Sequence, residues 1–530
     1  MPDQDAQLRQ SRSTRIAIAL LALAILWCLY WFVHAWRYWE DDAYIHLEFA
    51  HSLAAGRGFS FNGHVVAGET APLWVFFLAG THALIPDWLV AGKLLSALGV
   101  IVGLSGAYAF ARRLAASLLP PQNAALFPAA VVLLIVANPF FCYWAYSGME
   151  PLAASGLAFF AVLAATRQRP SAKSFLTVSL LAGLAPLLRP EMIFLTALLA
   201  LPLLAQWRGI PFRPNSLSRV TAFLSGLLLL VGPTVLWSLY SLHAFGHLLP
   251  NTYAAKRAAA SDSVLRHLLS IYSFGFPLIL CGLLAGVAYL LLRPTSVRRS
   301  LAAAIAAAFQ PPAESTPAVA DKAVHPTRCL PLAGWIFLLW PAIVTLFYIA
   351  NHTYVQTRYI LVTAPGLTLV ILILALQASR HTGRVLYAAA LLAALAVSLI
   401  TVRPFIRNKA INCQTTTSLA EYMRDHLPPD APVAVYSIGE IAFISQHPII
   451  DIGGITRPGA IPYLNAPPEA MLGWARTQGA QYFIGEKPEP NAILVFAADQ
   501  RFLGWSLHPA LYDTTNALQL WKLTPLTPNH

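Results

Sequence analysis

The stretch IAIALLALAILWCLYWFVH, residues 16–34, runs directly into AWRYWEDDAYIHLEFA, residues 35–50, and the two together decide the fold. The first stretch contains no Asp, Glu, Lys or Arg, and about 20 mostly apolar residues suffice for a helix to cross a bilayer. Aromatic residues gather at its end, which is typical of a membrane interface. No small-residue cleavage site follows it, so we expect an uncleaved first membrane helix.

The composition indicates that most of the chain, not only its start, lies in a membrane. Of its 530 residues, 57% are hydrophobic and 11% are charged. Soluble domains carry about 25% charged residues. Further apolar runs lie at Leu89–Ala111, Leu217–Tyr240, Ala333–Ala350 and Val385–Val402. We predict a mainly α, polytopic helical membrane protein with about eleven spans. The net charge of +12 is spread between apolar runs and forms no single basic face, which argues against a nucleic-acid partner.

Lys and Arg alternate in density between successive loops, with about 18 such charges on one side and about 8 on the other. The richer side is predicted to be cytoplasmic. Pro72–Ile85 is apolar but too short to cross, so we expect it to lie as a helix at the outer membrane surface. The first outer loop then covers about residues 37–88. Later outer segments are expected at Tyr146–Glu150, Arg189–Glu191, His243–Ser270 and Asn351–Tyr359.

Two domains are predicted, a transmembrane domain at 1–403 and a small C-terminal α/β domain at 404–530 on the extracytoplasmic side. A cytoplasmic linker at about 294–330 includes a stretch rich in Ala and Pro. In the C-terminal domain the patterns predict helices at Ser418–His426 and Pro468–Gln478, and strands at Val433–Tyr436, Tyr482–Ile484 and Leu518–Leu523.

Three consecutive carboxylates, Glu40, Asp41 and Asp42, follow the first span at the membrane surface. Adjacent like charges raise one another's pKa and are costly unless a cation or a substrate uses them. A solvated helix N-terminus is the alternative, because acidic residues there interact favourably with the helix dipole.

The remaining motifs resemble those of the GT-C superfamily of membrane glycosyltransferases. The nearest likeness is to the branch that contains mycobacterial terminal arabinofuranosyltransferase B, in which an acidic pair after the first span precedes a Gly-rich turn and a Gly-x-Thr-x-x-Leu-Trp run. The matching pieces here are Glu40–His46, Gly56–Gly63, Gly68–Trp74, Ser147–Glu150, Leu188–Glu191, Gly246–Tyr253 with Lys256, and Arg358–Tyr359. The likeness covers about residues 38–360, and the outer loops derived above contain all of these motifs.

The resemblance implies a role for each polar residue in these motifs. Asp41 is implied as the general base toward an acceptor hydroxyl, next to Asp42 as a second catalytic residue. The implied substrate-binding residues are His46, Glu69, Glu150, Arg189, Asn251, Tyr253, Lys256 and Arg358, with the basic side chains on the donor phosphate. A divalent cation such as Mg²⁺, Mn²⁺ or Ca²⁺ on Asp42 and Glu69 is a further expectation, although Glu69 stands where that branch often has an aromatic residue.

These roles predict transfer of a sugar, with arabinofuranose as one candidate, from a polyprenyl-phosphate donor to an extracytoplasmic glycan, lipid or protein. The expected location is a bacterial inner membrane, with the site and the C-terminal domain in the periplasm. The sequence contains no Walker A or Rossmann motif, so a nucleotide-linked donor is not expected. The alternatives are a polytopic transporter or lipid-linked glycan flippase, although no internal repeat is found, and a tail domain that acts as a binding module. Within that domain the Ile452–Ile455 turn is a candidate acceptor contact.

Overall fold

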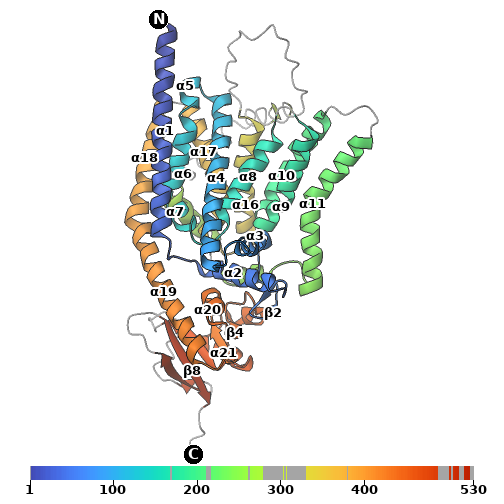
Figure 1. The fold of residues 1–530 in the computed structure, drawn as a ribbon, viewed down its shortest axis with the longest axis vertical. Coiled ribbons are helices and arrows are strands. Elements are labelled where there is room, and N and C mark those ends of the chain that lie inside the picture. The colour runs from blue at the N-terminus through green and yellow to red at the C-terminus, as the bar shows by residue number, and fades with distance from the viewer. Residues whose placement is uncertain are drawn as a thin grey trace, which may run out of the picture.

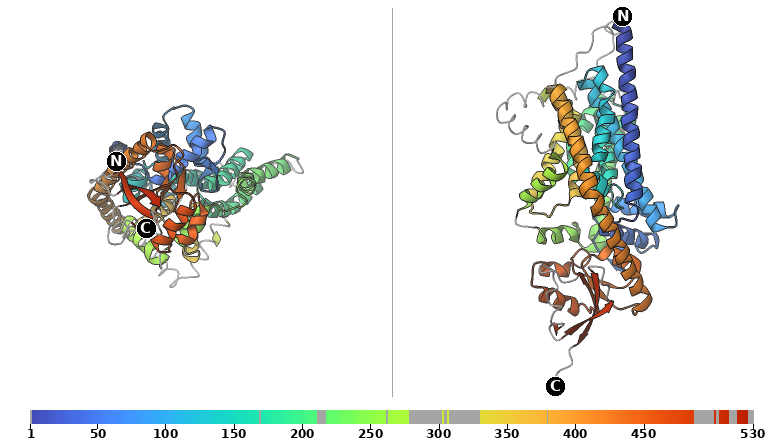
Figure 2. Two further views of the ribbon diagram at one scale, coloured as in Figure 1. Left: turned by 90° about the horizontal axis from the view of Figure 1, so that it is seen from below. Right: turned by 90° about the vertical axis from the view of Figure 1, so that its left-hand side faces the viewer.

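Most of the chain forms one elongated molecule, a helical bundle with a small α/β domain at one end (Figure 1). The structure is a computed structural model and describes residues 2–167, 170–210, 217–260, 263–277, 330–378 and 380–486, with short pieces at 302–303, 306, 501–502, 505–511 and 518–525. The N-terminus and the C-terminal domain lie at opposite ends (Figure 2). The bundle end nearest the C-terminal domain is called the distal end below.

Seven helices of the described chain are long and apolar enough to cross a membrane. Six of them are α1 (Pro2–His34), α4 (Trp88–Leu118), α10 (Met192–Gly209), α11 (Leu217–Phe245), α16 (Leu332–Ala350) and α17 (Thr357–Ala378). The seventh is continuous through α18 (Arg380–Val397), the π-helical turn η2 (Ser398–Val402) and α19 (Arg403–His426). Shorter apolar helices are α6 (Phe127–Ala137), α8 (Pro151–Ala165) and α9 (Ala172–Leu188). The protein is therefore a polytopic membrane protein, as predicted.

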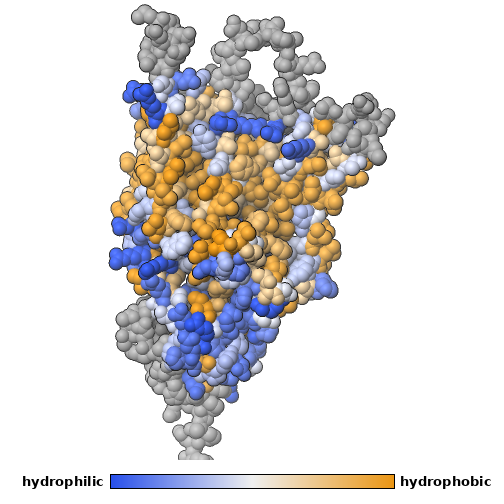
Figure 3. Space-filling model, in the orientation of Figure 1, coloured by the Kyte–Doolittle hydropathy of each residue, from blue (hydrophilic) through white to orange (hydrophobic). Residues whose placement is uncertain are grey.

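Apolar side chains cover the bundle as a broad band, and hydrophilic atoms gather near both of its ends (Figure 3). Small residues bring the central helices together, as is usual where helices pack in lipid. A Cβ atom on Gly156 of α8 would lie 2.8 Å from the backbone nitrogen of Gly103 of α4. Nearly all of the expected cytoplasmic linker at 294–330 falls outside the described residues.

The first loop forms a compact layer at the distal end. It contains α2 (Asp41–Ala54), the hairpin of β1 (Ser60–Phe61) and β2 (His64–Val65), and α3 (Pro72–His82). Asn62 and Gly63 form the hairpin turn with φ of 51° and 81°, which is the conformation that Asn-Gly favours. Helix α3 has 11 residues, lies beside α2 at the distal end and covers most of Pro72–Ile85, the stretch expected to form a helix too short to cross (Figure 1).

Other short helices complete this end of the bundle. They are α7 (Pro139–Trp144), α12 (Asn251–Ala258) and α13 (Val264–Gly275), whereas α5 (Pro121–Ala124) lies near the opposite end (Figure 1).

The C-terminal domain contains a six-stranded sheet in the order β4-β3-β5-β8-β7-β6. Its strands are β3 (Val433–Val435), β4 (Ile449–Asp451), β5 (Tyr482–Glu486), β6 (Arg501–Phe502), β7 (Trp505–Leu511) and β8 (Leu518–Pro525), with β3 parallel to β4 and β5 and the other pairs antiparallel. Helices α20 (Ile438–Ser445), η3 (Pro458–Tyr463) and α21 (Pro468–Thr477) lie between strands. The predicted elements are present, and α20, β4, β6 and β7 are additional. The predicted boundary at 404 falls inside the continuous helix of α18 to α19.

Candidate functional site

The acidic triplet lies where α1 turns into α2, and two of its members have separate protein partners. Glu40 accepts hydrogen bonds from the Tyr38 and Tyr143 hydroxyls, at 2.6 and 2.8 Å. Asp41 accepts one from the backbone N–H of Glu440 in the C-terminal domain, at 3.0 Å. These separate donors offset the repulsion that three adjacent carboxylates would otherwise create.

Asp42, the third acid, forms an ion pair with Arg358 from the start of α17. Burial opposes ionisation of Asp42, but Arg358 and then Lys256 hold the pKa of its carboxyl below the usual range. The Arg358 side chain is 4% exposed and lies over the Trp144 ring. Asp42 therefore anchors a buried arginine from a helix more than 300 residues away in sequence.

Three cations surround the Tyr359 ring and are called the cation cluster. The distances to the ring centroid are 4.8 Å for Arg189, 4.9 Å for Lys256 and 5.4 Å for Arg358. Within the described part of the chain, the buried Nε and Nη1 atoms of Arg358 have no hydrogen-bond partner, and the Tyr359 hydroxyl interacts with the Lys256 side chain. Buried polar atoms are rarely left unpaired, so these two nitrogens point to a polar ligand such as a phosphate.

A second network joins the first loop to α8. His46 of α2 contacts Glu69 at 2.7 Å and Glu150 at 3.4 Å. Burial alone would lower the pKa of His46, but the carboxylates of Glu69 and Glu150 together raise it to about 10. His46 is therefore protonated at neutral pH and holds two acids from separate loops. The other Glu69 oxygen accepts from the Ala71 backbone N–H at 2.5 Å.

Arg189 closes this network on its far side. Its guanidinium contacts Glu150 at 2.5 Å and Glu191 at 2.8 Å. Glu191 also accepts a hydrogen bond from the Tyr348 hydroxyl at 2.5 Å. With two carboxylates already bound, Arg189 is less available to a phosphate than Arg358 or Lys256 is.

Lys93, in the first turns of α4, holds the segments that carry these acids. Its side chain is fully buried, and its ammonium donates to the backbone carbonyls of Ala35, Tyr38 and Tyr146. The ammonium also lies 4.4 Å from the Trp39 ring centroid. All three donor positions of the ammonium are used, and they link the chain before Asp41 to the chain before Glu150.

Helix α12 contributes mainly through its backbone position. The Asn251 N–H donates to the Ala67 carbonyl at 2.8 Å, and the Tyr253 hydroxyl donates to Asn351 at 3.1 Å. These contacts fix the helix that carries Lys256 against the first loop. Among the described residues, no hydrogen bond, ion pair or ring contact joins the side chain of Asn251 or Tyr253 to the cation cluster.

A divalent cation on Asp42 and Glu69 does not fit this arrangement. Each carboxylate is already engaged, Asp42 with Arg358 and Glu69 with the protonated His46. The described residues contain no group of three or more His, Cys, Asp or Glu side chains that could hold a metal ion.

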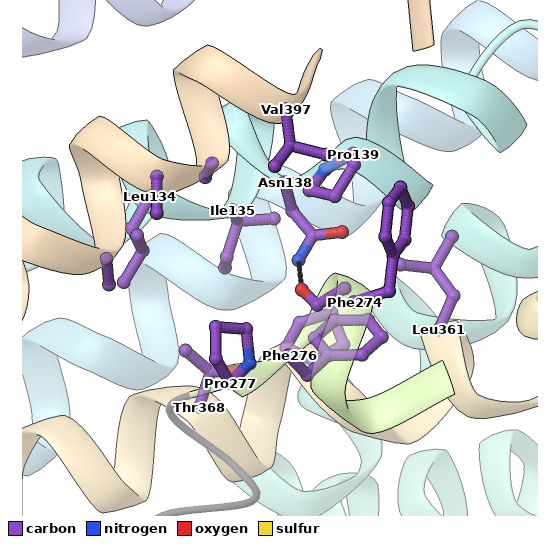
Figure 4. A pocket seen from close by; sticks show the side chains of 15 residues that line it. Leu134, Ile135, Asn138, Pro139, Phe274, Phe276, Pro277, Leu361, Thr368 and Val397 are labelled. Carbon is purple, nitrogen blue, oxygen red and sulfur yellow. Dashed lines mark hydrogen bonds between the residues drawn. The ribbon is translucent and has the colours of Figure 1, made fainter. Parts of the chain in front are cut away.

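An apolar pocket lies between α6, α13, α17 and α18 (Figure 4). Its lining includes Leu361, Pro365 and Thr368, which form one face of α17, and Ala393 and Val397 of α18. Leu361 is three residues beyond Arg358, just under one helical turn, so the pocket begins close to the residue that carries part of the cation cluster.

Most of the residues predicted for the site lie close together in the structure. Several other residues, which the motifs did not indicate as site residues, lie among them. Asp42, His46, Glu69, Glu150, Arg189, Lys256 and Arg358 belong to connected or adjacent networks, and Asp41 turns toward the C-terminal domain. Tyr359, Lys93 and Glu440 were not proposed from sequence. Lys93 could have been found because a lysine inside an apolar helix is unusual, and Tyr359 because it directly follows Arg358. The sequence around Glu440 gave no such signal.

The many apolar helices, the acids at the distal end of the bundle and the attached α/β domain define the class, which is a polytopic membrane protein. The chain is similar to ArnT from Cupriavidus metallidurans bound to undecaprenyl phosphate, with a TM-score of 0.53, 13% identity, and 95% of this chain and 97% of that chain covered. The apo state of the same protein gives a TM-score of 0.52 at 13% identity, with the same coverage. At this identity the likeness concerns the fold.

Two further comparisons are weaker or partial. The chain also resembles the archaeal oligosaccharyltransferase AglB from Archaeoglobus fulgidus in complex with an inhibitory peptide and a dolichol-phosphate, with a TM-score of 0.48, 12% identity, and 96% of this chain and 74% of that chain covered. Residues 406–524 match the model of a domain of unknown function, DUF8728. No curated protein matches the chain.

Proposed function

We propose that the protein is a membrane glycosyltransferase that moves a sugar from a polyprenyl-phosphate donor to an extracytoplasmic acceptor. One observation carries this proposal: buried nitrogens of Arg358 without partners lie beside Tyr359, Lys256 and Asp42, and the Asp41 carboxylate is the next residue in the chain. A phosphate needs several such donors, and a sugar hydroxyl needs a base. The GT-C fold supports the same class of reaction.

The cation cluster is the proposed site of the donor phosphate. Two free nitrogens of Arg358 and the Tyr359 hydroxyl offer hydrogen bonds, and Lys256 adds a charge on the same ring. When the bond between the sugar and the phosphate breaks, negative charge grows on the phosphate oxygen. Cations aimed at that oxygen stabilise the transition state more than the ground state.

Asp41 is the proposed general base. Burial raises the pKa of its carboxyl to about 7, against the lowering effect of the Glu440 backbone hydrogen bond. A base with a pKa near the working pH is both available and strong enough to accept a proton. Asp42, which forms an ion pair with Arg358, has its pKa lowered and is better suited to hold that arginine than to act as the base.

The reaction balances without any further reagent. The acceptor oxygen forms a bond to the anomeric carbon of the sugar, and its proton passes to Asp41. The bond between that carbon and the phosphate oxygen breaks, and the polyprenyl phosphate leaves with the electron pair. The cation cluster binds this product until it departs.

The apolar pocket of Figure 4 offers a place for the first isoprene units of the donor. Its lining includes Leu361, three residues beyond Arg358 in α17, and consists mainly of apolar side chains from α6, α13, α17, α18 and the segments next to them. An isoprenoid chain attached to a phosphate in the cation cluster would extend into such a lining with little desolvation cost.

The orientation follows from the distribution of positive charge. Arg and Lys are denser in the loops assigned to the other end of the bundle, so the distal end is proposed to face the periplasm of a bacterial inner membrane. Arabinofuranose is the proposed sugar on the strength of the motif resemblance alone. The acceptor is a surface glycan, a lipid or a secreted protein.

A transfer assay with purified protein tests this function. The protein is incubated with a panel of polyprenyl-phosphate pentoses and hexoses and an acceptor glycan, and product is measured for wild type, Asp41→Asn and the surface control Asp425→Asn. Wild type and Asp425→Asn should form product and Asp41→Asn should form little. Equal product from Asp41→Asn and wild type would show that Asp41 is not the general base. Movement of a solute or lipid across vesicle membranes, without any glycan product, would favour a transporter.

A further inference from the structure

The contacts of the C-terminal domain with the first loop include three close ones, beside the ring contacts of Phe443 with Tyr44 and His51. The Asn62 side chain donates to the His447 carbonyl at 2.8 Å and accepts from the Ile449 N–H at 2.7 Å, so its amide pairs like a backbone unit. A Cβ atom on Gly68 would lie 3.3 Å from the Thr456 methyl group. The third close contact is the one between α20 and Asp41.

A fourth contact joins the same domain to the helix that carries Lys256. The Asn465 side chain donates to the Ala258 carbonyl at the end of α12, at 2.6 Å. The domain therefore contacts both the first loop, which carries the proposed base Asp41, and α12, which carries the proposed phosphate ligand Lys256. Figure 2 shows the domain lying against the distal end of the bundle.

The contact at Asp41 is unusually close. Asp41 Oδ1 accepts from the Glu440 N–H in the first turn of α20, at 3.0 Å. A Cβ atom on Gly439 would lie 2.0 Å from the Asp41 backbone oxygen and 3.1 Å from Oδ1. Only glycine allows α20 to approach this far, and a helix N-terminus favours a carboxylate through its free N–H groups and its dipole.

We propose that α20 of the C-terminal domain is a positioning element of the active site, which holds the Asp41 carboxylate through the first backbone amides of the helix. This inference rests on the proposed function of Asp41 and gives a role to the region that matches a domain of unknown function. The domain then completes the site, because the base is not fixed by the membrane part alone.

The titratable groups around Asp41 decide how its pKa responds when α20 moves. Glu40, Asp42 and Tyr44 share its segment, and Glu440 faces it from α20. Burial raises the pKa of the Glu440 carboxyl to about 8, against a hydrogen bond from Thr417, and the nearby Asp41 raises it further. Glu440 is therefore mostly neutral at pH 7, and its backbone amide, not its side-chain charge, is what acts on Asp41.

The test is Gly439→Ala, with Gly459→Ala of the same domain as the matched control. A Cβ atom on Gly459 would meet nothing closer than Trp474 at 3.4 Å, which is an ordinary contact. Alanine also favours a helix over glycine by about 1 kcal/mol, so Gly439→Ala should not unfold α20 itself. The new methyl group instead pushes α20 away from Asp41.

We expect Gly439→Ala to lower kcat by roughly ten- to a hundredfold, with the KM for the donor unchanged, and Gly459→Ala to behave as wild type. The acid limb of the pH profile should move to higher pH, because the lost N–H donors favoured the charged carboxylate. A merely structural defect would lower the amount of active enzyme without moving this limb. Wild-type kcat and an unmoved limb in Gly439→Ala would overturn the proposal.

A docking measurement separates this inference from the proposed function. The double variant Gly68→Cys with Thr456→Cys should form a disulfide readily between the first loop and the C-terminal domain. Adding Gly439→Ala to this double variant should reduce the disulfide yield. This readout needs no donor, so an inactive wild type would refute the proposed function alone, and an undiminished disulfide yield would refute the docking role alone. Asn62→Ala, which removes the two amide hydrogen bonds, should loosen the same interface if Gly439→Ala cannot be purified.

Discussion

Replacing Arg358 by glutamine is the perturbation that reports most clearly on the proposed phosphate site. The Arg358 side chain is 4% exposed, bound on one side by Asp42 and left with two free buried nitrogens on the other. Glutamine removes the charge and most of the donors while keeping some of the side-chain volume. The change therefore affects the donor phosphate and the Asp42 ion pair together.

The size of the effect follows from the bonds removed. A hydrogen bond to a charged group contributes about 1.5–3 kcal/mol, and about 1.4 kcal/mol corresponds to a tenfold change in rate or affinity. Loss of the phosphate contact should therefore lower kcat/KM by about 10- to 150-fold. Arg358→Lys should recover part of this loss through its charge, but not the forked geometry of the guanidinium.

The assay is the initial rate of sugar transfer at several donor concentrations. Arg57→Gln, an exposed arginine of the first loop, is the matched control and should leave kcat/KM unchanged. The double variant Asp42→Asn with Arg358→Gln should unfold at a higher temperature than Arg358→Gln, because it no longer leaves a carboxylate without its partner. A kcat/KM for Arg358→Gln within threefold of wild type would refute the phosphate assignment.

Three other outcomes follow from the same geometry. Transfer by wild type should rise with pH through about 7, because Asp41 accepts a proton only when deprotonated and its pKa is raised to about 7; a rate that falls across that range would contradict this assignment. Lys93→Met should lower the free energy of unfolding by at least about 3 kcal/mol, since three buried carbonyls lose their donor, and thermal unfolding in detergent should show no such loss for the partly exposed Lys409→Met. Ala393→Trp should fill the apolar pocket and raise the KM for a long-chain donor, whereas Leu392→Trp, on the exposed side of α18, should leave it unchanged; equal KM values would exclude the pocket as a lipid site.

The membrane helices could be predicted from the sequence because their signal is local. A run such as residues 16–34 specifies its own environment through length and apolarity, without reference to the rest of the chain. The surface helix α3 was predicted for the same reason, since Pro72–Ile85 is too short to cross. Strands β6 and β7 and helix α20 were missed because short elements in a mixed sheet depend on partners elsewhere in the chain.

The pairing inside the site could not be predicted, since it depends on residues far apart in sequence. Asp42 and Arg358 are 316 residues apart, and Asp41 and Glu440 are 399 apart. The motifs indicated which acids and bases gather at one end of the bundle. They did not indicate that Asp42 would bind Arg358 while Asp41 turned toward α20, because adjacent residues of a helix project in different directions.

We propose above all that basic side chains from separate segments of the chain bind one lipid-linked phosphate at the distal end. A cryo-electron microscopy structure of the wild-type protein with a polyprenyl phosphate tests it most directly. We expect the phosphate within hydrogen-bond distance of Arg358, Tyr359 and Lys256, with the isoprenoid chain leading toward Leu361. A phosphate bound at the N-terminal end of the bundle, or one that leaves these three side chains untouched, would contradict it.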